Sequence, residues 1–180
     1  MSKLVIFLAD GFETCEALIP LDLLKRAGVE VDTVSISDKK EVVSSHDVEV
    51  KADKLFEEIE FDSYDAYFLP GGKLGTDNLF ACEELKERLI DACNNGKLIS
   101  AICAAPSILG KIGLLKGKKY TCYPGFEGDF EAEYTREKVE VDGNIITGKG
   151  MGAAIEFSKA LITYLFDENE ANRVLMSVQY

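Results

Sequence analysis

Short apolar runs alternate with amphipathic helix patterns along the chain, and this alternation constrains the fold more than any other feature. Strands are predicted at 4–9, 29–36, 66–69 and 98–102, and helices at 14–27, 83–95, 104–113, 153–166 and 168–178. Repeated strand–helix units with short connections are typical of a mainly parallel sheet covered by helices on both faces. We therefore expect an α/β fold.

The remaining segments fit the same domain. A hairpin is predicted within 38–50, a short strand at 119–122, and a second hairpin formed by 138–141 and 145–147. No linker, repeat or low-complexity tract interrupts the 180 residues, which are enough to bury a full core. We expect one domain over residues 1–180.

Composition excludes several classes of partner. The chain is 47% hydrophobic and 29% charged, with a formal net charge of −12, and this acidity argues against binding to nucleic acid or an anionic membrane. No apolar run is long enough to cross a bilayer. The run at 4–9 is cut short by Asp10 and is too brief for the core of a signal peptide. We expect a cytoplasmic protein.

The cysteines do not suggest a disulfide framework or a zinc site. There are five, none in a CxxC pair, and His46 is the one histidine. Such a scattered, odd-numbered set indicates reduced thiols. We expect no metal and no organic cofactor. The five are Cys15, Cys82, Cys93, Cys103 and Cys122.

Cys103 is the candidate nucleophile. It follows the apolar run 98–102 and precedes a helix pattern with Pro106 in its first turn. A helix amino terminus offers free N–H groups and partial positive charge, which favour a thiolate, so we expect a pKa below the usual value of about 8.5. The alternative is a buried cysteine acting as a small hydrophobic residue. Ala104 and Ala105 favour the reactive interpretation, because small neighbours leave the sulfur uncovered.

A glycine-rich turn follows another predicted strand. Pro70-Gly71-Gly72 allows a tight turn that exposes backbone N–H groups, and two such donors beside a nucleophile would stabilise an oxyanion. The alternative is that the glycines only permit positive φ. Beside Cys103, the amides of Gly71, Gly72 and Ala104 become candidate donors.

Glu16 is the unusual residue of the first helix pattern. Its neighbours Cys15, Ala17 and Leu18 are apolar, and a carboxyl group in an apolar site has a raised pKa. It could then donate a hydrogen bond to the Cys103 sulfur or move a proton. The alternative is an ordinary first-turn acid favoured by the helix dipole, which fits Glu13 as well.

These motifs together resemble the ThiJ/PfpI superfamily, in the branch of the parkinsonism-associated protein. The segments that carry the resemblance are 4–20, 69–75 and 100–106, in order and at matching spacing. The resemblance implies a flavodoxin-like three-layer α/β sandwich and a homodimer. It also implies a nucleophile-elbow cysteine, matched by Cys103, beside a protonated glutamate, matched by Glu16, with the Gly72 amide near the sulfur.

The resemblance also implies roles for residues farther along the chain. Arg26 and His46 fall where the family places basic groups that reach the site of the neighbouring subunit. The segment 148–152, which includes Met151, falls beside the reactive cysteine and lines the site.

Two positions depart from the family pattern. Protease-like members have a histidine directly after the cysteine, where this chain has Ala104, and the nearer branch often has a histidine where this chain has Tyr123. Proteolysis and glutamine amide transfer need a base to activate the nucleophile and protonate an amine. We therefore expect neither activity, and Tyr123 is a site-lining residue.

Three functions remain open from the sequence. The first is cofactor-independent glyoxalase or deglycase chemistry on small α-oxoaldehydes such as methylglyoxal, in which Cys103 forms a hemithioacetal and Glu16 moves a proton. The second is a redox-responsive protective or chaperone-like protein that acts through oxidation of Cys103 to the sulfinate. The third is a binding protein that kept the fold and lost the chemistry.

Overall fold

A seven-stranded sheet forms the centre of the computed structural model, which describes residues 2–180. The strand order is β10-β11-β7-β6-β1-β2-β5, and every neighbouring pair is parallel except β10 and β11. This arrangement confirms the predicted mainly parallel sheet. The strands are β1 (Lys3–Leu8), β2 (Glu30–Ser35), β5 (Lys54–Leu55), β6 (Ala66–Leu69), β7 (Leu98–Ile102), β10 (Val139–Asp142) and β11 (Ile145–Gly148).

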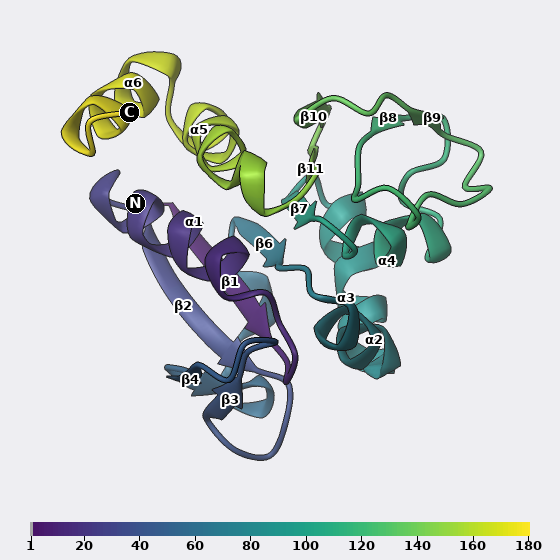
Figure 1. Ribbon diagram of the computed structural model, residues 1–180. Helices are drawn as coiled ribbons and strands as arrows, with labels where there is room; N and C mark the ends of the chain where they lie inside the picture. Colours follow the sequence, from purple (N-terminus) through teal and green to yellow (C-terminus); the bar gives the residue numbers. More distant parts are fainter. Residues whose placement is uncertain (1) are drawn as a thin grey trace.

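Helices cover both faces of the sheet, which gives three layers (Figure 1). Alternate residues of β1 serve the two faces: Leu4, Ile6 and Leu8 join one apolar cluster, and Val5 and Phe7 join the other. One face carries α1 (Thr14–Arg26), α5 (Ala154–Leu165) and α6 (Glu168–Ser177), and the other carries α2 (Lys73–Ala81), α3 (Glu83–Asn94) and α4 (Pro106–Lys111).

The predicted helices are confirmed, with shifted ends. The α1 helix begins after Glu13, whose side chain accepts a hydrogen bond from the N–H of Glu16 at 2.8 Å. This N-cap bond satisfies one of the first-turn N–H groups that have no partner within the helix. The helix predicted at 104–113 is shorter at both ends, because α4 covers Pro106–Lys111. The helix predicted at 153–166 begins one residue later, after a 3-10 turn at Met151–Ala153.

The α2 helix was not predicted, because Gly75 lowers the helix propensity of its segment. The structure explains this glycine. A Cβ at position 75 would lie 2.7 Å from the backbone nitrogen of Phe12, so only glycine lets α2 pack this closely on the loop after β1. Tertiary packing overrides local propensity here.

The short peripheral elements are partly as predicted. A hairpin of β3 (Glu41–Val43) and β4 (Glu49–Lys51) lies within 38–50. The strand predicted at 119–122 is only β8 (Lys119–Tyr120), which pairs with β9 (Glu133–Tyr134). Two-residue strands such as β5 and β9, and the 3-10 turns at Phe56–Glu58 and Phe61–Ser63, are too short to show a periodic pattern.

The strand order decides where a site can form. Four neighbouring strands of the sheet run in the same direction: β11, β7, β6 and β1. The loops at their carboxyl ends therefore meet at one edge, which is where ligands bind in open α/β sheets. No helix among residues 2–180 is long and apolar enough to cross a membrane.

Candidate active site

Cys103 lies in a strained turn directly after β7. Its φ is +64°, a left-handed conformation that is uncommon for a residue with a Cβ. Two backbone hydrogen bonds hold it there: its N–H donates to the carbonyl of Gly148 at 2.9 Å, and its carbonyl accepts the N–H of Tyr123 at 2.8 Å. The turn thus presents the half-buried thiol at the carboxyl edge of the sheet.

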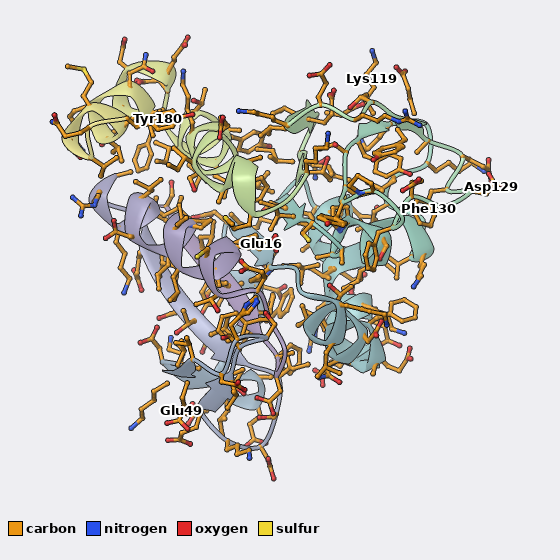
Figure 2. The ribbon with its side chains drawn as sticks, viewed as in Figure 1. Glu16, Glu49, Lys119, Asp129, Phe130 and Tyr180 are labelled. Carbon is orange, nitrogen blue, oxygen red and sulfur yellow. The ribbon has the colours of Figure 1, made fainter. Side chains whose placement is uncertain are left out.

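Glu16 reaches the same place from the first turn of α1. Figure 2 shows it near the centre of the molecule, and the residue is only 1% exposed. Its Oε2 accepts the N–H of Gly71 at 3.0 Å, and its carboxyl group is hydrogen-bonded to the Cys103 side chain and to the backbone of Met151. The predicted cysteine–glutamate pair is therefore in contact.

Two backbone N–H groups face the sulfur, those of Gly72 and Ala104. Gly71 does not serve as a donor to the reacting group, because its N–H is taken by Glu16. The prediction for Gly71 was thus wrong, and its role is different. A Cβ at position 71 would lie 2.5 Å from the Cβ of Cys103, so glycine is required for the close approach of the two loops.

The glutamate and the thiol both have raised pKa values. Burial raises the pKa of Glu16 to about 7, against the opposing effect of its hydrogen bond with Cys103. Burial raises the pKa of Cys103 to about 12, and the charge of an ionised Glu16 adds to this, whereas the amides of Gly72 and Ala104 lower it. The predicted low pKa of Cys103 is wrong, because desolvation and a neighbouring carboxylate outweigh the helix terminus.

The pair is best described as one unit. It loses its first proton near pH 7, and its second only at strongly alkaline pH. Between these two pH values the pair carries one negative charge. The charge is either on Glu16, with a neutral thiol, or on the Cys103 sulfur, with a protonated Glu16. The second arrangement removes the carboxylate that raises the pKa of Cys103, and it leaves three donors around the sulfur.

The other site-lining residues lie beside the pair. Tyr123 and Met151, which are 52% and 53% exposed, line a hollow of about 550 Å³. Gly150 connects this hollow to the pair, since a Cβ there would lie 3.3 Å from the Tyr123 ring and 3.9 Å from Glu16 Oε1. The sequence identified 148–152 only as a segment beside the cysteine. The contacts of the Gly148 carbonyl and the Met151 backbone depend on tertiary structure.

Arg26 and His46 do not join the site within one chain. Arg26 is at the far end of α1 from Glu16 and pairs with Asp22 at 2.7 Å. His46 is exposed in the loop of the β3–β4 hairpin, and its Nδ1 lies 3.2 Å from Ser45 Oγ. Among residues 2–180, no group of three or more His, Cys, Asp or Glu side chains is arranged to hold a metal ion.

Fold and site together define an α/β protein with a cysteine–glutamate pair at the carboxyl edge of a parallel sheet. The sequence matches the DJ-1/PfpI family over residues 2–164. The chain belongs to that family, and its relatives place it in the DJ-1-like branch.

Sequence and structure comparisons agree on this assignment. Protein DJ-1 homolog B of Arabidopsis thaliana is 37% identical over 175 residues, which cover 96% of this chain but 40% of the plant protein. Deglycase PfpI of Pyrococcus furiosus is 31% identical over 166 residues, covering 91% of this chain and 99% of that protein. The solved structure of oxidised Toxoplasma gondii DJ-1 superposes with a TM-score of 0.94 at 35% identity, covering 100% of this chain and 99% of the other.

Proposed function

We propose that the protein is a cofactor-independent, cysteine-dependent enzyme that converts small α-oxoaldehydes such as methylglyoxal to hydroxy acids. One observation carries the proposal: the Cys103 side chain is hydrogen-bonded to Glu16, a buried glutamate whose pKa is raised to about 7. Such a group can give and take a proton at neutral pH. The deglycase name of the Pyrococcus furiosus relative supports related chemistry on aldehyde adducts of amino groups.

The first step is addition. The Cys103 thiolate attacks the aldehyde carbon and forms a C–S bond, while the carbonyl electron pair moves to oxygen, which takes the proton of Glu16. The product is a hemithioacetal. The amides of Gly72 and Ala104 stabilise the thiolate before attack, because both donate toward the sulfur.

The second step is an isomerisation followed by hydrolysis. Glu16, now a carboxylate, removes the hydrogen of the former aldehyde carbon as a proton and returns it to the neighbouring carbon, while the hydroxyl proton on the former aldehyde oxygen passes to the former ketone oxygen. The former aldehyde carbon is thereby oxidised to a thioester, and the former ketone carbon is reduced to an alcohol. Water then cleaves the thioester, which releases lactate and restores the thiol. No external oxidant or reductant is consumed.

The same residues argue against proteolysis. Cysteine-dependent peptide hydrolysis pairs the nucleophile with a histidine that protonates the departing amine. Here the one histidine, His46, is hydrogen-bonded to Ser45 on an exposed hairpin, and the group paired with Cys103 is a carboxyl group. The aldehyde reaction needs no imidazole, because no amine departs and Glu16 carries out the proton transfers. We therefore expect no cleavage of casein.

The test is steady-state lactate formation from methylglyoxal. Cys103→Ser and Glu16→Gln should abolish turnover, and Cys82→Ser, a half-buried thiol at the end of α2, should retain it. Wild-type activity that persists in Cys103→Ser, or full activity in Glu16→Gln, would overturn the mechanism.

A second function, redox sensing, is favoured by the same donors. Peroxide oxidises a thiolate to a sulfenate and then, with a second equivalent, to a sulfinate, releasing one water each time. A protonated Glu16 and the amides of Gly72 and Ala104 would bond the new oxygens, and a relative was solved in an oxidised form. A mass increase of two oxygens confined to Cys103 at low peroxide, and slower in Glu16→Gln, would support this function.

We also propose that the protein is a homodimer in which Arg26 and His46 approach the partner's site. An apolar hollow of about 370 Å³, lined by Leu18, Ile19 and Tyr180 among others, leaves part of α1 uncovered. Leu24, on the same helix, is fully buried in its own core and contributes nothing to an interface. Light scattering that reports 19.8 kDa at micromolar concentration would refute the dimer.

A further inference from the structure

The hollow beside the catalytic pair is much larger than methylglyoxal needs. It has a volume of about 550 Å³, within the range of sites that hold drug-sized ligands. Neither Cys103 nor Glu16 lines it, but Gly150 does, and a Cβ built on Gly150 would lie 3.3 Å from the Tyr123 ring and 3.9 Å from Glu16 Oε1. The space left by the missing side chain of Gly150 therefore adjoins both the hollow and the catalytic pair, and a substrate longer than methylglyoxal would extend from Cys103 past this glycine.

The walls of the hollow are mostly apolar. Tyr123 and Met151 are about half exposed there, and Pro124 and Ala153 complete the surface. Gly152 leaves additional room, since a Cβ at that position would have no neighbour within 4 Å. An aromatic ring and a thioether that line the same hollow favour a flat, apolar group.

Two lysines, Lys138 and Lys149, are among the residues that line the hollow, and only one of them has a carboxylate partner in the described part of the chain. Lys138 is neutralised by Glu156, at 2.5 Å. Lys149 has no carboxylate within ion-pair distance among residues 2–180, and its Nζ donates only to the carbonyl of Arg136, at 3.2 Å. In a chain with a formal net charge of −12, an uncompensated ammonium group beside an apolar hollow selects a negatively charged ligand.

We propose that this hollow is a substrate subsite, and that the enzyme prefers α-oxoaldehydes in which the dicarbonyl is attached to a flat apolar group with a terminal carboxylate. The inference rests on the proposed function, and it names the substrate class. Tyr123 and Met151 contact the apolar body, and Lys149 pairs with the carboxylate. The chemistry at Cys103 and Glu16 is the same, with an arylglyoxal converted to the corresponding mandelate.

The test compares kcat/KM for methylglyoxal, phenylglyoxal and 4-carboxyphenylglyoxal, with the hydroxy acids quantified by chromatography. Ratios between substrates are compared across variants, so that differences in the intrinsic reactivity of the aldehydes cancel. Tyr123→Ala and Met151→Ala should each lower the ratio of phenylglyoxal to methylglyoxal roughly tenfold, the effect of removing apolar contact from a pocket. Lys149→Gln should lower the ratio of 4-carboxyphenylglyoxal to phenylglyoxal about threefold, as for a partly exposed ion pair.

Lys159→Gln is the matched control, because Lys159 pairs with Glu168 and does not line the hollow. Its substrate ratios should equal those of the wild type. Unchanged ratios in Tyr123→Ala, Met151→Ala and Lys149→Gln, with methylglyoxal turnover intact, would overturn the subsite and leave the proposed function standing.

A binding measurement decides the subsite independently of turnover. Binding of 4-carboxymandelate to Cys103→Ser is followed by NMR, and it should shift the resonances of Tyr123 and Met151 and weaken about threefold in the additional variant Lys149→Gln. If wild-type protein converts none of the aldehydes, the proposed function fails, and this titration still confirms or overturns the subsite. Absence of shifts in the 149–153 segment would overturn it.

Discussion

Cys103 and Cys122 lie on neighbouring segments, and burial raises the pKa of both thiols to about 12. Their surroundings differ. Cys103 is half-buried, with a glutamate and two amides at its sulfur, whereas Cys122 is 0% exposed in an apolar cluster, its pKa raised further by Glu127. The pKa of a thiol therefore does not identify the nucleophile here. Cys103 is identified as the nucleophile because a proton acceptor contacts it directly and because it is accessible to solvent.

Alkylation should separate the two thiols by the largest factor. Iodoacetamide at pH 7.5 should modify Cys103 on the order of a thousandfold faster than Cys122, because Cys122 reacts only when the structure opens locally, at a cost of several kcal/mol. Mass spectrometry of peptides at timed intervals measures both rates. In urea, where both thiols are exposed, the two rates should be equal, which is the control. Equal rates in the native protein as well would show that the structural difference has no chemical consequence.

Glu16→Gln should change how stability depends on pH. The pKa of Glu16 is about 7 in the folded protein against its usual 4.5, so the folded state holds this proton more tightly. The stabilisation is complete below pH 4.5 and is lost as pH rises to 7. At about 1.4 kcal/mol per pH unit, the free energy of unfolding of the wild type should fall by about 3 kcal/mol relative to Glu16→Gln between pH 4 and 8.

Glu156→Gln provides the control with the opposite sign. Burial raises the pKa of Glu156, but the hydrogen bond from Lys138 and other contacts outweigh burial and hold the pKa below its usual value. Its contribution to stability is present at neutral pH and lost on acidification, so Glu156→Gln should be most destabilising near pH 7. Urea titrations at several pH values measure both variants. Parallel pH profiles for wild type and Glu16→Gln would contradict the raised pKa of Glu16.

Gly71→Ala should damage the Cys103 region and leave the Cys122 region intact. The new Cβ would lie 2.5 Å from the Cβ of Cys103, and such overpacking costs about 1–3 kcal/mol. Methylglyoxal turnover should fall with it. Gly96→Ala is the control, because a Cβ at that position would have no neighbour within 4 Å. This variant should lose only about 1 kcal/mol of stability, the cost of a Cβ at a positive φ. Full activity of Gly71→Ala would refute the close approach.

Cys122→Ala should have the smallest effect. Removing one buried sulfur leaves a small cavity, which costs about 1–2 kcal/mol, and turnover should stay close to that of the wild type. Thermal unfolding and lactate formation test the two expectations. A loss of turnover as complete as in Cys103→Ser would mean that the two thiols act together.

Much of the fold follows from local pattern. The apolar runs and helix periods identified the main strands and most helices because those segments are long enough to show their period. The α2 helix was missed because Gly75 serves a contact with Phe12 that no local pattern records. The two-residue strands β5 and β9 were missed because pairing partners, which are distant in sequence, define them.

The site divides in the same way. The sequence determined which groups are present, a cysteine at a strand-to-helix turn and an acid among apolar residues, and parallel strand order brings them to one edge. Only the tertiary structure decided that the Gly71 amide binds Glu16, and that desolvation raises the pKa of Cys103 where the helix terminus alone would lower it. Desolvation depends on every atom packed around a group, and those atoms come from loops far apart in the chain.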